Sequence, residues 1–279
     1  MSDDGLIFSY LLDGQGGGKR YGWDDVRAWQ PEDGVLWIHL DYSVSEAESW
    51  MRNESGLNAH ISEILTSDET RPRFLKVDIG IVIILREINS NKGADLDDLI
   101  SLRIYASGSL IISCRKRCLF SEVVIANLLD EHGGPKDSGG FLVSITEQIV
   151  DHMGGVISSL EDQAGEIAET VSKGQGIEIR GQLSDLRRTL IRLRRYLSPQ
   201  REALGEAVTA QIDWISEKDT HRLREVSNDT VRYLEALDSA RDLALVTHEE
   251  LSQQLSEATG KRMYLLSIVA AIFLPLSFV

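Results

Sequence analysis

The sequence has few of the residues that hold disulfides and zinc sites. Only two cysteines occur among 279 residues, Cys114 and Cys118, and no second pair stands elsewhere. The six histidines are scattered, without the short spacings at which zinc ligands occur. We therefore expect neither a disulfide framework nor a zinc finger, and a reducing compartment fits this composition.

Positive charge is also in short supply. Lysine and arginine together number 29 against 44 aspartates and glutamates, which gives a formal net charge of −15. Because such a chain repels polyanions at long range, general affinity for nucleic acid or for anionic lipid headgroups is not expected. The charge balance suits a protein that handles cations.

Catalytic motifs are missing as well. The sequence contains no serine elbow, no paired catalytic carboxylates and no nucleophile with a neighbouring base. The glycine-rich segment 13–20 lacks the glycine spacing of a phosphate-binding loop, and Arg20 stands where that loop has its hydroxyl residue. A hairpin turn is predicted there instead. We predict neither an enzyme nor a bound cofactor.

Long apolar runs are absent until the end of the chain. No charged residue occurs from Met263 to Val279, and at about 1.5 Å per residue this run covers roughly 25 Å of the roughly 30 Å hydrocarbon layer of a bilayer. Lys261 and Arg262 precede the run, as expected on the cytoplasmic side of a span. We expect 263–279 to be the start of a first transmembrane helix, and a buried C-terminal core helix is the alternative.

The first half of the chain alternates strand-like and helix-like patterns. The expected strands are Leu6–Leu12, Val35–Leu40, Ile79–Ile88, Leu99–Ala106 and Ser109–Arg115, and the expected helices are Ser43–Asn53, Ala59–Ser67 and Phe120–Glu131. After the loop His132–Gly140 the pattern is purely helical, with helices near Phe141–Ser172, Ile177–Thr209 and from Ile215 onward. Pro199 is expected to bend or break the second of these helices.

The predicted fold class is an N-terminal mixed β-sheet covered by helices, followed by a helical part with a long C-terminal stalk helix that runs into the first transmembrane segment. The expected boundaries are 1–138 for the N-terminal α/β domain, 139–212 for a helical hairpin region, 213–262 for the stalk helix and 263–279 for the start of the transmembrane helix. The first four residues lack the features of a signal peptide. The part before the span is therefore expected in the cytoplasm.

The stalk helix carries two stripes at helical spacing. One is an apolar seam of Leu234, Leu237, Ala244, Leu251, Leu255 and Ala258, which Arg241 and His248 interrupt. The other is first acidic and then hydroxylated, and its members are Glu235, Asp238, Asp242, Glu249, Ser252, Ser256 and Thr259. It continues into the apolar run as Met263, Leu266, Ala270, Leu274 and Ser277.

The second stripe, which we call the ion-path face, predicts a function. If several copies turned it toward a shared axis, its acidic end would concentrate cations and its apolar rings would gate by dewetting. An ordinary solvated face is the alternative. We also predict weak zinc binding by Asp238, Asp242, His248 and Glu249.

A basic cluster precedes the stalk helix. It consists of Arg187, Arg188, Arg192, Arg194 and Arg195. Leucines interleave with these arginines at helical spacing, so the cluster indicates the charged outer face of a packed helix, which could meet acidic residues of a neighbour, rather than an RNA site.

Several stretches resemble a known family. Leu265–Val279, which ends Ala-Ala-Ile-Phe-Leu-Pro-Leu-Ser-Phe-Val, resembles the first membrane helix of the CorA family of metal-ion transporters. Four stretches resemble its zinc-transporting ZntB branch, namely Glu69–Arg73, Leu102–Tyr105, Gly139–Val143 and Tyr196–Arg201. The similarity covers essentially the whole chain.

The resemblance implies a homopentamer in the bacterial inner membrane, with zinc as the transported ion and the α/β domain on the cytoplasmic side. The apolar members of the ion-path face and Ser277 would line the pore, and the C-terminal segment would contact the lipid bilayer. A Gly-x-Asn loop that selects hydrated cations and a second membrane helix would follow Val279, so the chain as given would not transport by itself. Magnesium, cobalt or nickel transport is one alternative, and a tail-anchored membrane scaffold is another.

Overall fold

The computed structural model describes residues 4–276, except 69–70, 92, 96–97 and 175–178. The chain divides into two compact units. The first unit comprises residues 1–156 and 193–234, and the second comprises 157–192 and 235–279. All strands of the described residues lie in the first unit, and the second unit is helical.

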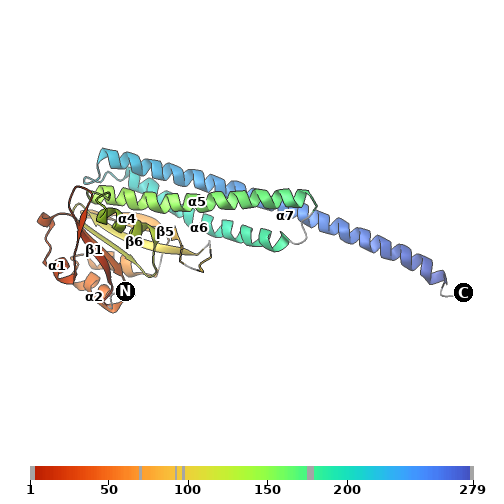
Figure 1. Ribbon diagram of the computed structural model, residues 1–279, viewed down its shortest axis with the longest axis horizontal. Coiled ribbons are helices and arrows are strands. Elements are labelled where there is room, and N and C mark those ends of the chain that lie inside the picture. Colours follow the sequence, from red (N-terminus) through yellow and green to blue (C-terminus); the bar gives the residue numbers. More distant parts are fainter. Residues whose placement is uncertain (1–3, 69–70, 92, 96–97, 175–178, 277–279) are drawn as a thin grey trace. The chain divides into compact units, whose positions relative to one another are not determined.

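The first unit is built on a seven-stranded sheet with the order β2-β1-β3-β7-β6-β5-β4 (Figure 1). Its strands are β1 (Leu6–Leu12), β2 (Gly18–Arg20), β3 (Leu36–Asp41), β4 (Arg73–Val77), β5 (Gly80–Ile88), β6 (Leu99–Ser107) and β7 (Leu110–Arg115). Neighbouring strands are antiparallel except β3 and β7, which pair in parallel with His39 opposite Ser113. The predicted mixed sheet is confirmed.

Helices cover both faces of the sheet. They are α1 (Trp23–Ala28), α2 (Ser45–Asn53), α3 (Ala59–Thr66) and α4 (Phe120–Asp130), together with the nearer parts of α5 (Ser138–Ser172), α6 (Arg180–Thr209) and α7 (Glu217–Leu276). Side chains alternate along a strand. On β5, Val82 and Ile84 therefore pack in the core with α1, α2 and α3, whereas Ile81 and Ile83 pack in the core with α4 and the long helices.

A buried polar network joins α4 to the sheet. Glu122 of α4 is fully buried and pairs with Arg115 of β7, while its Oε2 lies 2.9 Å from Nε2 of His39 on β3. Nδ1 of His39 lies 2.7 Å from Oγ of Ser113, which also accepts a hydrogen bond from Nε1 of Trp37 at 2.7 Å. A buried carboxylate is tolerated only when it is paired and hydrogen-bonded, as here. His39 is therefore a structural residue.

Four short elements were not predicted, namely β2, β4, α1 and the 3-10 helix Pro31–Asp33. Most of the predicted elements differ from the structure by one to three residues at an end. Ile79 lies in the turn before β5 rather than in the strand, where Asp78 has a positive φ of 25°. The predicted loop His132–Gly140 is also too long, because α5 already begins at Ser138.

Helix α6 continues without interruption through Pro199, so the predicted break is wrong. Proline removes one backbone donor and crowds the carbonyl four residues earlier. Here Leu197 and Ala203, on either side of Pro199, are almost fully buried, and this packing holds the helix together across the lost hydrogen bond. A bend at Pro199 stays a prediction.

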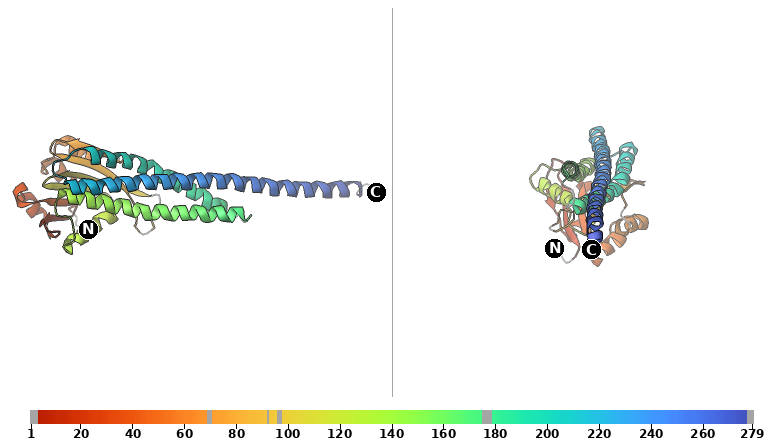
Figure 2. Two further views of the ribbon diagram at one scale, coloured as in Figure 1. Left: turned by 90° about the horizontal axis from the view of Figure 1, so that it is seen from above. Right: turned by 90° about the vertical axis from the view of Figure 1, so that its right-hand side faces the viewer.

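In the second unit, the far parts of α5 and α6 run beside α7 (Figure 2). Their buried side chains are Leu160, Ala164, Ile167 and Val171 of α5, Leu183, Leu186 and Leu190 of α6, and Leu237, Ala240, Ala244 and Leu251 of α7. Nε2 of Gln254 donates to the backbone oxygen of Val171 at 2.9 Å, which fixes the end of α5 against α7. The apolar seam predicted on the stalk helix therefore packs inward in this unit, and Leu255 and Ala258 continue it as half-buried residues.

Candidate functional site

The ion-path face of α7 is accessible in a single copy. Its exposed members are Glu235, Asp242, Glu249, Ser252, Ser256 and Thr259, and Asp238 is half-buried. The face is turned by about 100° from the buried seam of the same helix, because most of its members directly follow a seam residue in the sequence. The stripe is therefore one continuous surface that α7 presents away from α5 and α6 in this unit.

Arg241 compensates part of the negative charge on this surface. Its Nη1 lies 3.2 Å from Oδ1 of Asp238, and its Nη2 donates to Oδ1 of Asp242 at 2.9 Å. Among the residues that the structure describes, Glu235 and Glu249 form no ion pair. Each copy therefore brings two uncompensated carboxylates to the ion-path face, which can attract cations without holding them tightly.

Hydroxyl groups follow the carboxylates toward the C-terminus. Oγ of Ser252 donates to the backbone oxygen of His248, and Oγ1 of Thr259 donates to that of Leu255, both at 2.8 Å. Because each proton is used by the helix itself, the hydroxyl oxygen is left as an acceptor. Acceptor oxygens of this kind suit a hydrated cation, whose waters donate hydrogen bonds outward.

The C-terminal part of α7 is apolar and uncovered in one copy. Met263 is 60% exposed and Leu266 is 63% exposed, and Ala270 is exposed too. The backbone of Leu274 belongs to α7 while its side chain lies outside what the structure describes, and Ser277 lies outside the described residues. A large exposed apolar surface indicates contact with lipid or with other protein surfaces.

None of the helices, over the residues described, has an apolar stretch long enough to cross a membrane. The assignment of 263–279 as the start of a span, and of its residues to a pore, stays a prediction.

Leu245 belongs to the ion-path face and was missed. It follows Asp242 by three residues and precedes Glu249 by four, so it lies on the same side of the helix. Its side chain is 44% exposed. The spacing alone identifies it, but its apolar side chain differs from the acidic and hydroxylated residues on either side of it. An apolar residue therefore interrupts the row of carboxylates.

The predicted zinc ligands are spread along the helix. Asp242 and His248 are separated by about 9 Å along the axis, at about 1.5 Å per residue. Within one copy, the described part of the chain has no group of three histidines, cysteines or carboxylates placed to hold a metal ion. Zinc binding by Asp238, Asp242, His248 and Glu249 stays a prediction, and it would need ligands from more than one copy.

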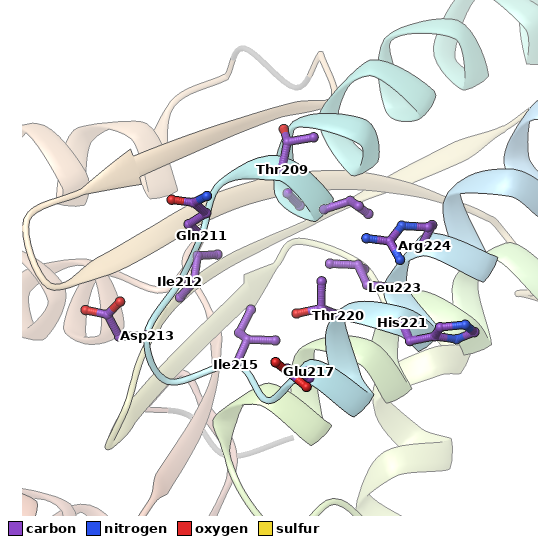
Figure 3. Close-up of a pocket in the computed structure, with 12 residues that line it drawn as sticks. Thr209, Gln211, Ile212, Asp213, Ile215, Glu217, Thr220, His221, Leu223 and Arg224 are labelled. Carbon is purple, nitrogen blue, oxygen red and sulfur yellow. The ribbon is translucent and has the colours of Figure 1, made fainter.

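A cavity of about 760 Å³ lies in the first unit, where α6 is connected to α7 (Figure 3). Its apolar wall includes Ile212, Ile215 and Leu223, and its polar lining includes His221 and Arg224. Lys76 of β4 holds the connection between α6 and α7 in place, because its Nζ donates to the backbone oxygens of residues 210 and 211. Asp213 and Glu217 also line the cavity, so it mixes carboxylates with an arginine and apolar side chains and has no single charge that would mark a path for cations.

Comparison with known proteins places the chain in a family. The family model described as CorA-like Mg2+ transporter protein matches residues 32–279. The divalent cation transporter CmaX of Pseudomonas aeruginosa is 34% identical over 281 residues, which cover 99% of this chain and 84% of that protein. The zinc transport protein ZntB of Yersinia enterocolitica is 34% identical over 273 residues, which cover 98% of this chain and 82% of that protein.

The fold agrees with a solved structure. The structure of the full-length CmaX protein matches this chain with a TM-score of 0.91 and 32% sequence identity, covering all of this chain and 86% of that one. Sequence and fold thus agree over both units. The chain belongs to the CorA-like Mg2+ transporter protein family, whose members are divalent-cation transporters and not enzymes.

Proposed function

We propose that this chain is the cytoplasmic part of a homopentameric zinc transporter in the bacterial inner membrane, with the start of its first transmembrane helix at 263–279. The observation that carries the choice of zinc is the 34% identity to the zinc transport protein ZntB over 98% of the chain. Membership of a transporter family also favours this function over a tail-anchored scaffold.

The proposed path runs along the ion-path face of α7. Glu235 and Glu249 raise the local concentration of cations, and the hydroxyl oxygens beyond them accept hydrogen bonds from the waters around the ion. Met263, Leu266, Ala270, Leu274 and Ser277 then line the pore, where apolar rings close it by excluding water. Zinc is the cargo in this scheme and not a bound cofactor.

Several copies are needed because one helix cannot enclose a path. In a cyclic ring each copy uses two different surfaces, one toward each neighbour, and the remaining surface faces the axis. The ion-path face suits the axial position, since it is largely exposed while the seam of α7 is already buried by α5 and α6 within the second unit. The apolar segment beyond Arg262 then meets lipid on its outer side.

Magnesium, cobalt or nickel is the second candidate cargo. It is favoured by the description of the matched family as a Mg2+ transporter and by CmaX, named a divalent cation transporter, whose identity to this chain equals that of ZntB. The face itself does not choose between these ions, because carboxylates and hydroxyls bind all of them.

Metal uptake by cells that express the gene encoding this chain separates the candidates. We expect faster accumulation of zinc than in cells without the gene, with no suppression by excess magnesium. Faster accumulation of magnesium, cobalt or nickel without any change for zinc would support the second candidate. Unchanged uptake of every divalent cation would contradict both.

Replacement of pore residues tests the path. Met263→Ala and Leu274→Ala are expected to increase the leak of divalent cations, because a smaller side chain weakens the dewetted ring. Tyr264→Ala is the matched control, since Tyr264 is 70% exposed but lies one residue away from the ion-path face. Equal flux in all three variants would remove Met263 and Leu274 from the pore.

A further inference from the structure

The outer face of α6 in the second unit is basic on a strongly acidic chain. Arg188 is exposed on this face, and its ion pair with Asp185 is long, at 3.7 Å. Arg192 is exposed on the same face, two residues after the buried Leu190. Since the formal charge of the whole chain is −15, this exposed row of arginines is a local basic surface that can attract an acidic one.

An uncovered apolar side chain lies between these arginines. Ile191 is 55% exposed, although Leu186 and Leu190 of the same helix are almost completely buried. Large apolar groups that remain exposed beside a charged cluster are typical of a contact surface. Arg188, Ile191 and Arg192 are named the α6 patch.

The outer face of α5 has the opposite charge. Asp162 and Glu166 are exposed and point away from the buried Ala164, because positions two residues on either side of it lie on the far side of a helix. Among the described residues neither carboxylate forms an ion pair. Ser158 and Ser159 are exposed one turn before Asp162, and their small side chains leave room for a larger side chain of a neighbour. These four residues are named the α5 patch.

The two patches lie at the same height along the hairpin. α5 ends at Ser172 and α6 begins at Arg180, joined by the short segment 173–179. At about 1.5 Å per residue, Asp162 is about 15 Å from the end of α5 and Arg188 is about 12 Å from the start of α6. A difference of about 3 Å is well within the reach of an arginine side chain. Ile191 correspondingly lies at the height of the small serines.

Equal height matters because rotation about an axis parallel to the helices keeps every residue at its height. In the second unit, α5 and α6 pack against the seam side of α7 and leave most of its ion-path face exposed. If that face points to the axis of a ring, the outer faces of α5 and α6 are available to the two neighbours. A ring contact joins two different surfaces, and surfaces of opposite charge are the favourable choice.

We propose that the α6 patch of one copy docks on the α5 patch of the next copy, with Arg188 between Asp162 and Glu166, with Arg192 beside Asp162, and with Ile191 over Ser158 and Ser159. The partner is a second copy of this chain, and the proposal rests on the ring assembly proposed above. Single exposed ion pairs contribute little to stability. We therefore expect the contact to add little affinity. Its charge complementarity instead sets which face of the neighbour is contacted and in which register.

Cross-linking between differently tagged copies tests this contact. Both forms carry Cys118→Ser, which removes the exposed thiol, and one carries Asp162→Cys while the other carries Arg188→Cys. The two are co-expressed, purified together and treated with a short bismaleimide. We expect linked dimers that contain both tags, and no linked dimers when either form is expressed alone.

Gln163→Cys is the matched control for Asp162→Cys. Gln163 is exposed but is turned by about 100° from its neighbour, so it points away from the proposed contact. Its cross-linking to Arg188→Cys is expected to be at least several-fold weaker. Equal yields from the two positions, or no dimer carrying both tags in an assembled sample, would overturn the proposal.

Charge reversal provides an independent readout. Asp162→Lys with Glu166→Lys is expected to reduce the assembled fraction at low salt, and adding Arg188→Glu and Arg192→Glu to the same chain is expected to restore it. Failure of this rescue in a chain that still folds by circular dichroism would contradict the pairing. If the chain without charge reversals assembles but its cysteine variants give no cross-link, only this contact is contradicted. If that chain is monomeric, the proposed homopentamer is contradicted as well.

Discussion

Two cysteines four positions apart occupy opposite environments. Cys114 is fully buried in β7, and this burial raises the pKa of its thiol to about 12. Cys118 is exposed in the connection to α4. Because the thiolate is the reactive form, only Cys118 is expected to react near neutral pH.

Thiol counting checks this difference. A maleimide is expected to label one thiol per folded chain and two after denaturation, and the folded Cys118→Ser variant is expected to stay unlabelled. Labelling of Cys114 in the folded chain at a rate similar to that of Cys118 would show that β7 is not the sealed core strand described above.

Asp151 of α5 has an unfavourable charge environment. Burial, together with the negative charges of Glu147 and Asp229, raises the pKa of its carboxyl above the usual range. A raised pKa in the folded state means that the protonated form stabilises the fold. This contribution is present below the ordinary pKa of aspartate and is lost as the pH rises through the raised value.

Asp151→Asn is therefore expected to raise the melting temperature at pH 7. The neutral amide never acquires the charge that the folded chain disfavours, so the gain should vanish below the ordinary aspartate pKa, where Asp151 is itself protonated. Glu225→Gln, at an exposed position of α7, is the control and should change little at either pH. A gain for Asp151→Asn that is larger in acid than at pH 7 would contradict the assignment.

At the scale of elements, α4 is held to the sheet at its first turn by a side chain from another strand. Glu87 of β5 is fully buried and accepts hydrogen bonds from the backbone nitrogens of Phe120 and Ser121 at 3.1 and 3.0 Å, and from Oγ of Ser121 at 2.6 Å. These donors carry the partial positive charge of the helix N-terminus. The carboxylate thus satisfies groups that would otherwise be buried without partners.

Glu87→Gln is expected to lower the free energy of unfolding by about 2 to 3 kcal/mol, because charge-assisted hydrogen bonds are lost and an amide nitrogen faces backbone donors. Ser121→Ala removes one hydroxyl and is expected to cost about 1 kcal/mol. Chemical denaturation of both variants measures the two changes. Equal costs would mean that the charge of Glu87 does not matter to α4.

The long elements could be predicted from the sequence, whereas the short strands and the contact between Glu87 and α4 could not. Long patterns such as β6 and the stalk helix were predicted because many residues repeat one spacing. Strand β2 has three residues, and β4 carries Arg73 and Lys76, so both depend on pairing with β1 and β5 rather than on their own pattern. The partnership of Glu87 with α4 joins residues far apart in the sequence, and no local signal marks it.

The ion-path face could be predicted from spacing, but its charge could not. In the sequence Arg241 interrupts the apolar seam, whereas in the structure its guanidinium lies against Asp238 and Asp242. Leu245 was overlooked because its chemistry differs from that of its neighbours on the stripe. The rotamer of a long side chain and the role of an apolar residue in a polar row depend on the folded surroundings.

At the scale of the whole molecule, charge is distributed unevenly within the second unit. Carboxylates mark the ion-path face of α7 and the outer face of α5, whereas arginines mark the outer face of α6. A chain with these three faces can form a closed ring in which opposite charges meet between neighbours and an acidic face remains for cations. In the proposed ring, the same charge distribution would serve both the contact between copies and the attraction of cations.

The account depends on one orientation, that of the ion-path face of α7 toward the conducting route. Two consecutive glutamates provide a matched test, because Glu249 belongs to the face and Glu250 is exposed but turned by about 100° from it. Each is replaced by cysteine in a Cys118→Ser background, in the gene that encodes this chain, and divalent-cation flux is measured before and after a positively charged methanethiosulfonate reagent is added. The account predicts strong inhibition of Glu249→Cys and little change for Glu250→Cys; equal inhibition, or inhibition of Glu250→Cys alone, would contradict it.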